Sequence, residues 1–503
     1  MENLTMKIST LTAALVIASA CTTGVAHAVS VNPHGLGQVL LYPYYTVNKG
    51  QDTLLSVVNS SDVGKAVKVR FLEGYNGRTV LDFTLFLSAH DIWSAAVSQV
   101  DSSSGAKITT TDHSCTFPQI VDAGPPFSAA NYSGAPGSTD SGPQTIARTR
   151  EGHIEIIADG DIVAGSATDQ RITHVQDGSP GGGSPAGCDA ITANGFGADL
   201  VTPTTGLRGS ASIVNVGEGT FFAYAADALS GFTSVAFTDT VADVDHDSLA
   251  RANTDGSAFT GGAVATVPTD SGEVLTLDYP RGIDAVSAVL MADSISNDYL
   301  VSAGLGANTD WIVTFPTKRF YVDPALVGNT AGAPFVETFN GGHSSVSLGL
   351  DIYDQEGFHQ SNRPPAEGCG ILCPALVPFM LPYEVNAIRF VPDTGTFAPS
   401  GVFGSQLSTV FGPLFGNASD GDAGWARIGF NDALEPHALT GGMNWPTPVA
   451  LNGLPSIGFM VYNIVNTNAA PGRLANYGAT FAHRSTMSCT PCENSPSGGA
   501  AAE

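Results

Sequence analysis

The sequence predicts a mainly β fold made of two tandem antiparallel β-sandwich (Ig-like) domains with one connecting helix. The first observation behind this prediction is composition: 43% of the residues are hydrophobic, 13% are charged, and the chain holds 58 glycines and 30 prolines. Such a chain has ample apolar material for a core and many turn-forming residues, as secreted β-rich proteins do. The other two observations are strands with a period of two and a recurring order of segments.

Strand patterning is clearest in the run "KAVKVRFLEG", where Val67 and Val69 alternate with Lys68. This is the period of a half-buried strand. The next run, "RTVLDFTLFLS", alternates in the same way, and "EGYNGR" between the two runs supplies an Asn-Gly turn. The two runs together predict a β-hairpin.

Five segments recur in the same order in the two halves of the chain. The first half contains "DTLLSVVNSS", "VKVRFLEGYNG", "LSAHDIWSAAV", "EGHIEIIA" and "GSASIVNVGEGTFFAYAADAL". The second half contains "TDWIVTFPTKR", "VSLGLDIYDQEG", "LPYEVNAIRFV", "AGWARIGF" and "GFMVYNIVNTNAAPGRLANYGATF". The identities are sparse and the similarity is one of pattern. The shared order predicts an internal duplication.

These segments set the expected domain boundaries. We expect a first β-sandwich domain at 29–235, a connector at 236–296, a second β-sandwich domain at 297–487 and a flexible tail at 488–503. The connector holds the strongest helical pattern, "GIDAVSAVLMADSI" at 282–295, with Asp284 as the expected N-cap.

Residues 1–28 have the pattern of a secretory signal peptide. Lys7 precedes the apolar run "LTAALVIASA", and "AHA" ends at residue 28, so cleavage is expected before Val29. A lipoprotein acylated at Cys21 is the alternative, which Ala18 disfavours because a bulky aliphatic residue is usual at that position. No later segment has about 18 uninterrupted apolar residues. The sequence therefore predicts an exported protein without a transmembrane segment, in the periplasm, on the outer cell surface or outside the cell.

The cysteines predict disulfides, because an exported chain with an even number of them usually forms a disulfide framework. Of the seven in the sequence, all except Cys21 lie after the expected cleavage site: Cys115, Cys188, Cys369, Cys373, Cys489 and Cys492. Cys115 and Cys188 lie in two long inserts of the first half, and we expect a bridge between them. The other four are expected to pair locally or with one another, with a four-thiolate zinc site as the alternative.

The stretch "NPHGLGQVLLYPYYTV" at 32–47 has two interpretations. Pro43 cannot donate a ladder hydrogen bond, so the stretch is expected to be an edge strand of the first sandwich. In the other interpretation, Tyr42, Tyr44 and Tyr45 form an aromatic platform for sugar rings. The edge strand is favoured, because no polar ligand-binding group accompanies the tyrosines in the sequence.

Motifs of common catalytic and cofactor sites are missing from the sequence. It contains no G-x-S-x-G, no H-E-x-x-H, no Walker loop and no G-x-G-x-x-G that opens a helix after a strand. We therefore expect no cofactor, no bound metal and no recognisable catalytic residue. The formal net charge of −26 disfavours nucleic acid as a partner. The tryptophans fall mainly within apolar strands and are expected in the core: Trp93, Trp311, Trp425 and Trp445.

Several phrases resemble an uncharacterised family of secreted β-rich proteins from Gram-negative bacteria. They include "GLGQVLLYPYYTV", "DWIVTFPTKRFYVD" and "LANYGATFAHR", and the resemblance extends over almost the entire mature chain. It implies an exported, β-rich protein of a Gram-negative cell. It brings no activity, cofactor or catalytic residue with it.

Three functions from different classes are compatible with the sequence. The favoured one is a non-enzymatic protein of the cell surface or the extracellular space, structural, adhesive or self-associating, whose partners are itself, other surface components or glycans. Self-association is expected through an edge strand at "DWIVTF", residues 310–315, which has no proline or lysine to block pairing with a neighbouring strand. One alternative is an extracellular carbohydrate-binding protein. The other is a secreted hydrolase whose carboxylates, such as Asp91 or Glu151, come together only in the fold.

Overall fold

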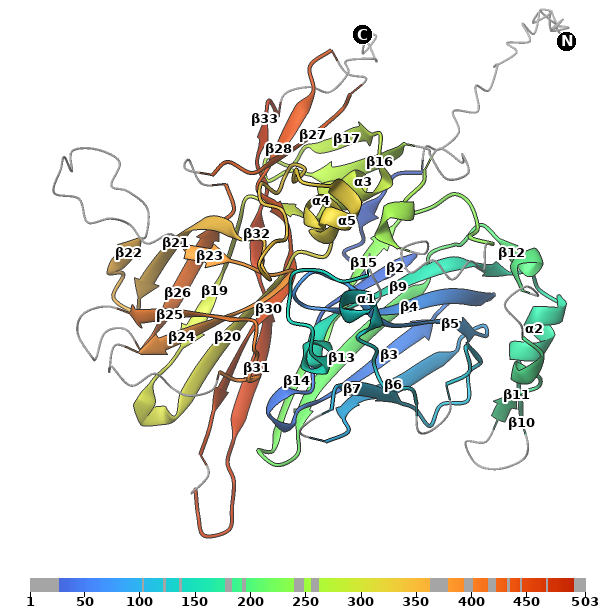
Figure 1. Cartoon of the computed structure of the whole chain (residues 1–503), viewed down its shortest axis with the longest axis horizontal. Coiled ribbons are helices and arrows are strands. Elements are labelled where there is room, and N and C mark those ends of the chain that lie inside the picture. Colours follow the sequence, from blue (N-terminus) through green and yellow to red (C-terminus); the bar gives the residue numbers. More distant parts are fainter. Residues whose placement is uncertain are drawn as a thin grey trace, which may run out of the picture.

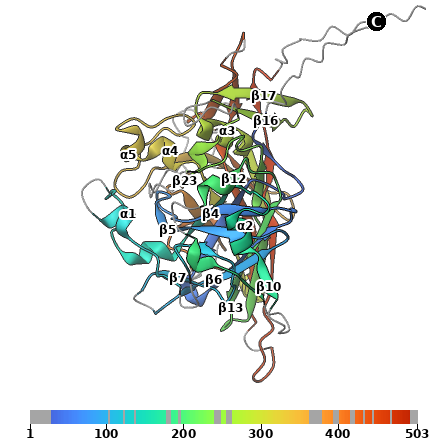
Figure 2. The ribbon, with the colours of Figure 1, turned by 90° about the vertical axis from the view of Figure 1, so that its right-hand side faces the viewer.

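The structure is a computed structural model. It describes residues 27–492 except 102–103, 121–123, 135–137, 177–182, 192–195, 239–247, 255–261, 362–378, 393–400, 415–421, 432–434, 444–445 and 467–468. The described chain is mainly β, as the sequence predicts, and most of its strands lie in two pairs of sheets that stand side by side (Figures 1 and 2).

The first sheet pair consists of an eight-stranded and a five-stranded sheet. The larger sheet has the order β1 (Ser30–Val31), β15 (Asp227–Ser230), β2 (Val39–Thr46), β9 (Glu151–Ile162), β4 (Gly64–Glu73), β5 (Thr79–Leu87) and β8 (Thr116–Phe117), with β12 (Leu200–Val201) paired to β9. The smaller sheet has the order β14 (Thr220–Ala225), β13 (Leu207–Asn215), β3 (Asp52–Asn59), β6 (Ile92–Gln99) and β7 (Ala106–Thr109). Apolar side chains of both sheets share one core, in which the ring centroids of Phe83 and Trp93 are 5.7 Å apart.

The second sheet pair consists of a six-stranded and a five-stranded sheet. The larger has the order β22 (His359–Ser361), β21 (Val346–Asp354), β26 (Ala423–Gly429), β19 (Ser294–Leu300) and β32 (Arg484–Thr486), with β23 (Phe379–Leu381) on β21. The smaller has the order β25 (Ser408–Leu414), β24 (Val385–Pro392), β20 (Ala307–Thr314), β30 (Ile457–Ile464) and β31 (Tyr477–Ala482). Tyr299 of one sheet stacks on Phe390 of the other, with ring centroids 5.3 Å apart.

The predicted hairpin at residues 65–87 is confirmed. β4 and β5 pair antiparallel, and Gly77 in the turn between them has a φ of 62°, which glycine adopts without strain. The two edge-strand predictions are wrong. β2 lies between β15 and β9, and Pro43 is accommodated where the register of β2 against β9 shifts between Tyr42 and Tyr45. The run "DWIVTF" falls largely in β20, the middle strand of its sheet.

The predicted helix begins as expected and ends early. α3 spans Gly282–Leu290, because Met291 enters β18 (Met291–Ala292), which pairs with β29 (Leu454–Pro455). Asp284 is not the N-cap. The cap position belongs to Arg281, whose guanidinium donates to the Asp284 carboxylate at 2.6 and 2.9 Å.

Short elements complete the described chain. The helices are α1 (Ala130–Ser133), α2 (Ala167–Ile172), α4 (Arg319–Val322) and α5 (Pro324–Val327). The small sheets are formed by β10 (His174–Gln176) with β11 (Gly183–Pro185), β16 (Ala263–Pro268) with β17 (Val274–Tyr279), and β27 (Ala438–Gly441) with β28 (Val449–Asn452) and β33 (Cys489–Thr490). None of the helices in the described ranges has the length and apolar character that a membrane-crossing helix needs.

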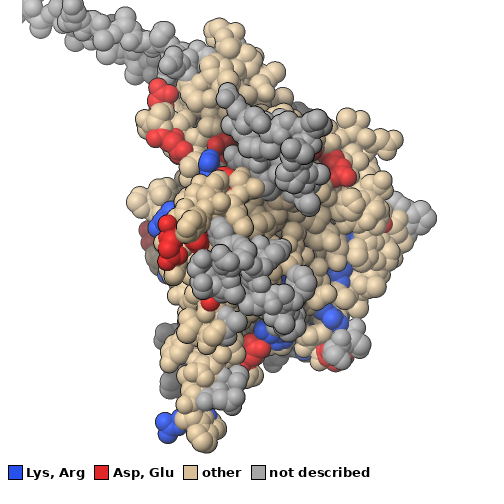
Figure 3. All heavy atoms as spheres, turned by 90° about the vertical axis from the view of Figure 1, so that its left-hand side faces the viewer, with Lys and Arg blue, Asp and Glu red and all other residues tan. Residues whose placement is uncertain are grey.

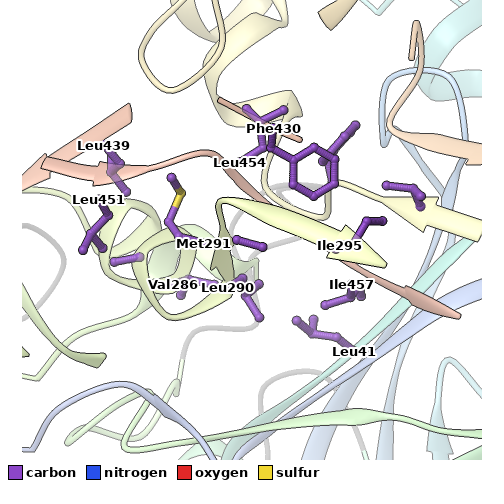
Figure 4. Close-up of a cluster of buried hydrophobic side chains, with 14 of the residues drawn as sticks. Leu41, Val286, Leu290, Met291, Ile295, Phe430, Leu439, Leu451, Leu454 and Ile457 are labelled. Atoms are coloured by element: carbon purple, nitrogen blue, oxygen red, sulfur yellow. The ribbon is translucent and has the colours of Figure 1, made fainter. Parts of the chain in front are cut away.

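The two sheet pairs share apolar cores across their boundary. Leu41 of β2 belongs to the same buried cluster as Val286 of α3, Ile295 of β19 and Ile457 of β30 (Figure 4). A second cluster extends across the boundary as well, with the rings of Tyr224 and Phe459 stacked at 4.7 Å. The halves are therefore held together by burial of apolar surface and not by a linker alone.

Candidate functional site

The tyrosines of the expected sugar platform are fully buried. Each hydroxyl donates to an internal acceptor: Tyr42 to the Ser56 carbonyl at 2.8 Å, Tyr44 to Glu151 Oε2 at 2.8 Å and Tyr45 to the Thr149 carbonyl at 3.1 Å. A ring that stacks on a sugar needs an exposed face. These three rings have none, so they are structural.

The two carboxylates considered for a hydrolase lie at opposite ends of the first sheet pair. Gly152, which follows Glu151, pairs with Glu73 at one end of β4. Leu87, the last residue of β5 before Asp91, pairs with Lys65 near the other end of β4. These two positions of β4 are eight residues apart, which corresponds to about 26 Å along an extended strand. The pair cannot act on one glycosidic bond, which needs carboxyl groups about 5–10 Å apart.

Glu151 links the two sheet pairs through hydrogen bonds. Its Oε2 accepts from the Tyr44 hydroxyl at 2.8 Å and the Ser405 hydroxyl at 2.6 Å, and its Oε1 accepts from the Gln406 amide at 2.8 Å. Burial raises the pKa of this carboxyl. The donors come from both halves of the chain, so Glu151 contributes to their junction.

Asp91 lies in a loop cluster that resembles a catalytic triad only in composition. Its carboxylate is 3.7 Å from Nδ1 of His174, and the Ser88 hydroxyl is 3.4 Å from the same nitrogen. A Ser-His-Asp triad requires the serine and the aspartate on different ring nitrogens. Burial raises the pKa of Asp91, whose carboxylate also accepts from the Ser88 amide and the Ser114 hydroxyl. The hydrogen bonds of this cluster therefore hold the neighbouring loops together.

The cysteines behave in part as expected. The sulfur atoms of Cys115 and Cys188 are 2.00 Å apart, which is bonding distance, so the expected bridge joins the two inserts. Cys489 and Cys492 pair locally. Cys369 and Cys373 lie outside the described residues.

The site with the best geometry for binding lies on the outer face of the six-stranded sheet. Tyr353 of β21 is the register partner of Trp425 on β26 and of His359 on β22. Its ring stacks on both neighbours, with centroids 4.2 Å from Trp425 and 4.5 Å from His359. Trp425 is 41% exposed, and its indole face away from Tyr353 is on the side of β19, where Asp298 is its register partner. We call these residues the aromatic row.

A polar row runs beside the aromatic row on the same face. Asp351 of β21 accepts from the Ser361 hydroxyl at 2.7 Å and lies 3.2 Å from Nε2 of His359. Its register partner on β26 is Arg427, whose side chain is 40% exposed. Figure 3 views the molecule from the side of the second sheet pair, where charged side chains are few. The two rows place aromatic rings next to charged hydrogen-bonding groups, of which Arg427 is partly exposed and Asp351 is buried.

The expectation that the tryptophans are core residues is correct for Trp93 and Trp311, which are fully buried. It is wrong for Trp425, and Trp445 lies outside the described residues. The alternation within this strand could have predicted that Trp425 faces outward. In "WARIGF" Trp425 shares its side of the strand with Arg427, whereas Ala426 and Ile428 point inward.

Clusters of three or more histidine, cysteine or acidic side chains able to hold a metal are absent from the part of the chain that the structure describes. Comparison of the sequence with protein-family models and curated proteins, and of the fold with solved structures, finds no match. The candidate site therefore stands on its own geometry.

Proposed function

We propose that this protein is an exported, non-enzymatic binding protein of the cell surface or the extracellular space, and that it adheres to glycans through the aromatic row. The single observation that carries the proposal is the exposed Trp425 indole stacked on Tyr353 next to charged groups. Sugar rings bind to proteins by stacking on aromatic faces, with polar groups close by to accept and donate hydrogen bonds.

Polar groups beside the aromatic row are suited to binding sugar hydroxyls. Asp298 beside Trp425 can accept hydrogen bonds from sugar hydroxyls, and Arg427 can donate them. Stacking on Tyr353 fixes the indole plane before a ligand arrives, which lowers the entropic cost of binding. The outer face of a sheet also fits an extended polymer better than a small molecule, which usually needs a concave pocket.

Self-association through strand edges has less support than adhesion. The two edges expected to accept a neighbouring strand, at β2 and β20, are interior strands whose backbone groups pair on both sides. Among the described strands, the facing edges β14 and β31 lie against each other, with the Asn476 side-chain amide donating to the Glu218 carbonyl. A contact made by side chains of an open face therefore fits the fold better.

We further propose that the two sheet pairs are tandem β-sandwiches that arose by internal duplication. The order β15-β2-β9-β4-β5 in one pair corresponds, strand for strand along the chain, to β32-β19-β26-β21-β22 in the other. The order β14-β13-β3-β6-β7 corresponds in the same way to β31-β30-β20-β24-β25. One pairing differs: β24 and β25 run parallel, whereas β6 and β7 run antiparallel.

The proposed function is tested by sedimenting the purified mature protein with insoluble polysaccharides and with whole Gram-negative cells. Trp425→Ala should abolish co-sedimentation, and Tyr353→Ala should weaken it by about tenfold because the indole loses its support. Tyr477→Ala is the matched control, since Tyr477 is a 63% exposed tyrosine on β31, away from the row.

Three outcomes would contradict the proposal. One is binding that survives Trp425→Ala. Another is equal loss in the Tyr477→Ala control. The third is release of soluble sugar from the polysaccharide by the unaltered protein, which would indicate a hydrolase.

A further inference from the structure

A cavity of about 200 Å³ lies between the two sheet pairs, away from the aromatic row. Its walls come from both halves: β1 and β15 on one side, and α3, β18, β19, β30 and β32 on the other. Much of the lining is aliphatic, with Leu290, Ile295 and Ile457 around the same region (Figure 4). The cavity is smaller than the roughly 300–1,000 Å³ of sites for drug-sized ligands. It therefore suits a small molecule with a short apolar chain.

One carboxylate in this cavity has no partner. Asp227 of β15 lines it and is partly exposed, and among the described residues no hydrogen bond or ion pair reaches its side chain. Burial raises the pKa of Asp227 to about 6, so the group is largely ionised at neutral pH. A carboxylate that is partly desolvated and has no partner in the protein is a group that proteins often use to bind a cation.

The other ionisable group in the lining is already satisfied. Nε2 of His483 lies 3.0 Å from the Ile312 carbonyl, and its Nδ1 lies 3.2 Å from the side-chain amide of Asn297. Burial lowers the pKa of His483 to about 4. This ring is neutral and cannot compensate the charge of Asp227.

Ser456, which is partly exposed, and Ser485, which is exposed, also line the cavity, and neither side chain makes a hydrogen bond within the described chain. A primary ammonium group has three N–H donors and no acceptor. These three lining residues can offer one carboxylate and two hydroxyl oxygens as acceptors, beside aliphatic walls. A neutral or anionic ligand would leave the carboxylate unpaired.

We propose that this cavity binds a small primary amine with a short aliphatic chain, whose ammonium group pairs with Asp227. Because the walls belong to both sheet pairs, the bound amine also holds the halves together. This site is independent of glycan adhesion, so either proposal can fail alone.

The test is isothermal titration calorimetry of the full mature protein with n-butylammonium, using 1-butanol as the uncharged ligand of matched size. The amine should bind at least about tenfold more tightly than the alcohol, because a charge-assisted hydrogen bond is roughly twice as strong as a neutral one. Asp227→Asn should remove this preference. Asp62→Asn, which alters an exposed carboxylate shortly after β3, should leave it unchanged.

Val31→Phe provides a second variant that keeps the carboxylate. Val31 lines the cavity and is 40% exposed, so a larger ring there should block the space without disturbing a packed core. Amine binding should be lost while the fold is retained in circular dichroism. The proposal is overturned if amine and alcohol bind alike, if the unaltered protein binds neither, if Asp227→Asn keeps the preference for the amine, or if Val31→Phe still binds the amine.

Discussion

The outer faces of the two large sheets occupy matching places in the strand order and have opposite surroundings. On the first, Arg70 and Glu155 are register partners on β4 and β9, fully buried, with a 2.6 Å ion pair between them. On the second, Asp351 and Arg427 are register partners on β21 and β26, and Arg427 is 40% exposed. The corresponding pair of strands thus carries a fully buried ion pair in one half and, in the other, a polar row in which Asp351 is buried and Arg427 is partly exposed.

The difference lies in what covers each face. Apolar residues on the outer face of the first sheet, such as Leu41 and Ile157, pack into a cluster with the connector and the second sheet pair. Glu384 approaches His153 to 3.7 Å over the same face. The aromatic row of the second sheet keeps Trp425 exposed. Of these two faces, only the second can meet a large partner in the folded protein.

The largest expected effect comes from breaking the covered ion pair. Arg70→Met should lower the free energy of unfolding by about 3–5 kcal/mol, because Glu155 would remain as a buried, unpaired charge. Arg427→Met on the open face should change it by no more than about 0.5 kcal/mol. Urea denaturation of both variants measures the contrast. Similar losses would show that the two faces do not differ in burial as described.

The stabilisation from each disulfide should increase with the length of the loop that it closes. Cys115 and Cys188 are separated by 73 residues, and replacing both by serine should cost about 4 kcal/mol in the chain-entropy estimate. Cys489 and Cys492 are separated by 3 residues, and the same replacement should cost about 2 kcal/mol. Thermal unfolding of the two double variants provides the comparison. An equal shift in melting temperature would contradict it.

The burial of Lys318 near Glu384 can be tested through the pH dependence of stability. Burial lowers its pKa to about 7, against an attraction from Glu384 and Glu337 that raises it. Between about pH 7 and 10 the unfolded chain binds a proton at this lysine that the folded chain has lost, so the lysine's contribution to stability rises with pH. The unfolding free energy of the wild type minus that of Lys318→Met should increase by up to about 1.4 kcal/mol per pH unit in that window. A flat difference would mean that Lys318 is not desolvated.

The smallest expected effect is on the open face itself. Trp425→Ala should lower the free energy of unfolding by about 1 kcal/mol, which corresponds to loss of the stacked pair with Tyr353. Trp93→Ala, in the core of the first sheet pair, should cost about 3–5 kcal/mol. Glycan binding should show the reverse order, with Trp425→Ala the more damaging of the two folded variants. Equal destabilisation would place Trp425 in a core.

Local patterns in the sequence were sufficient for several elements. The alternation around Val67 and Val69 and the Asn-Gly turn predicted the hairpin of β4 and β5, and the two inserts predicted the bridge between Cys115 and Cys188. These features depend on residues close in sequence or on the chemistry of a single residue type. The mainly β class followed for the same reason.

Contacts between distant segments decided the rest. The sequence of β2 contains Pro43 and suggested an edge, but β15 and β9 flank it, and Trp425 lies in an apolar run yet faces outward. Periodicity separates the two sides of a strand without saying which side another sheet will cover, because coverage depends on residues hundreds of positions away. The β class, the hairpin and the bridge could be predicted from the sequence alone. The fold was needed to show which strands are edges, which aromatic rings are exposed and where the unpaired Asp227 lies, because each of these depends on packing between the two halves.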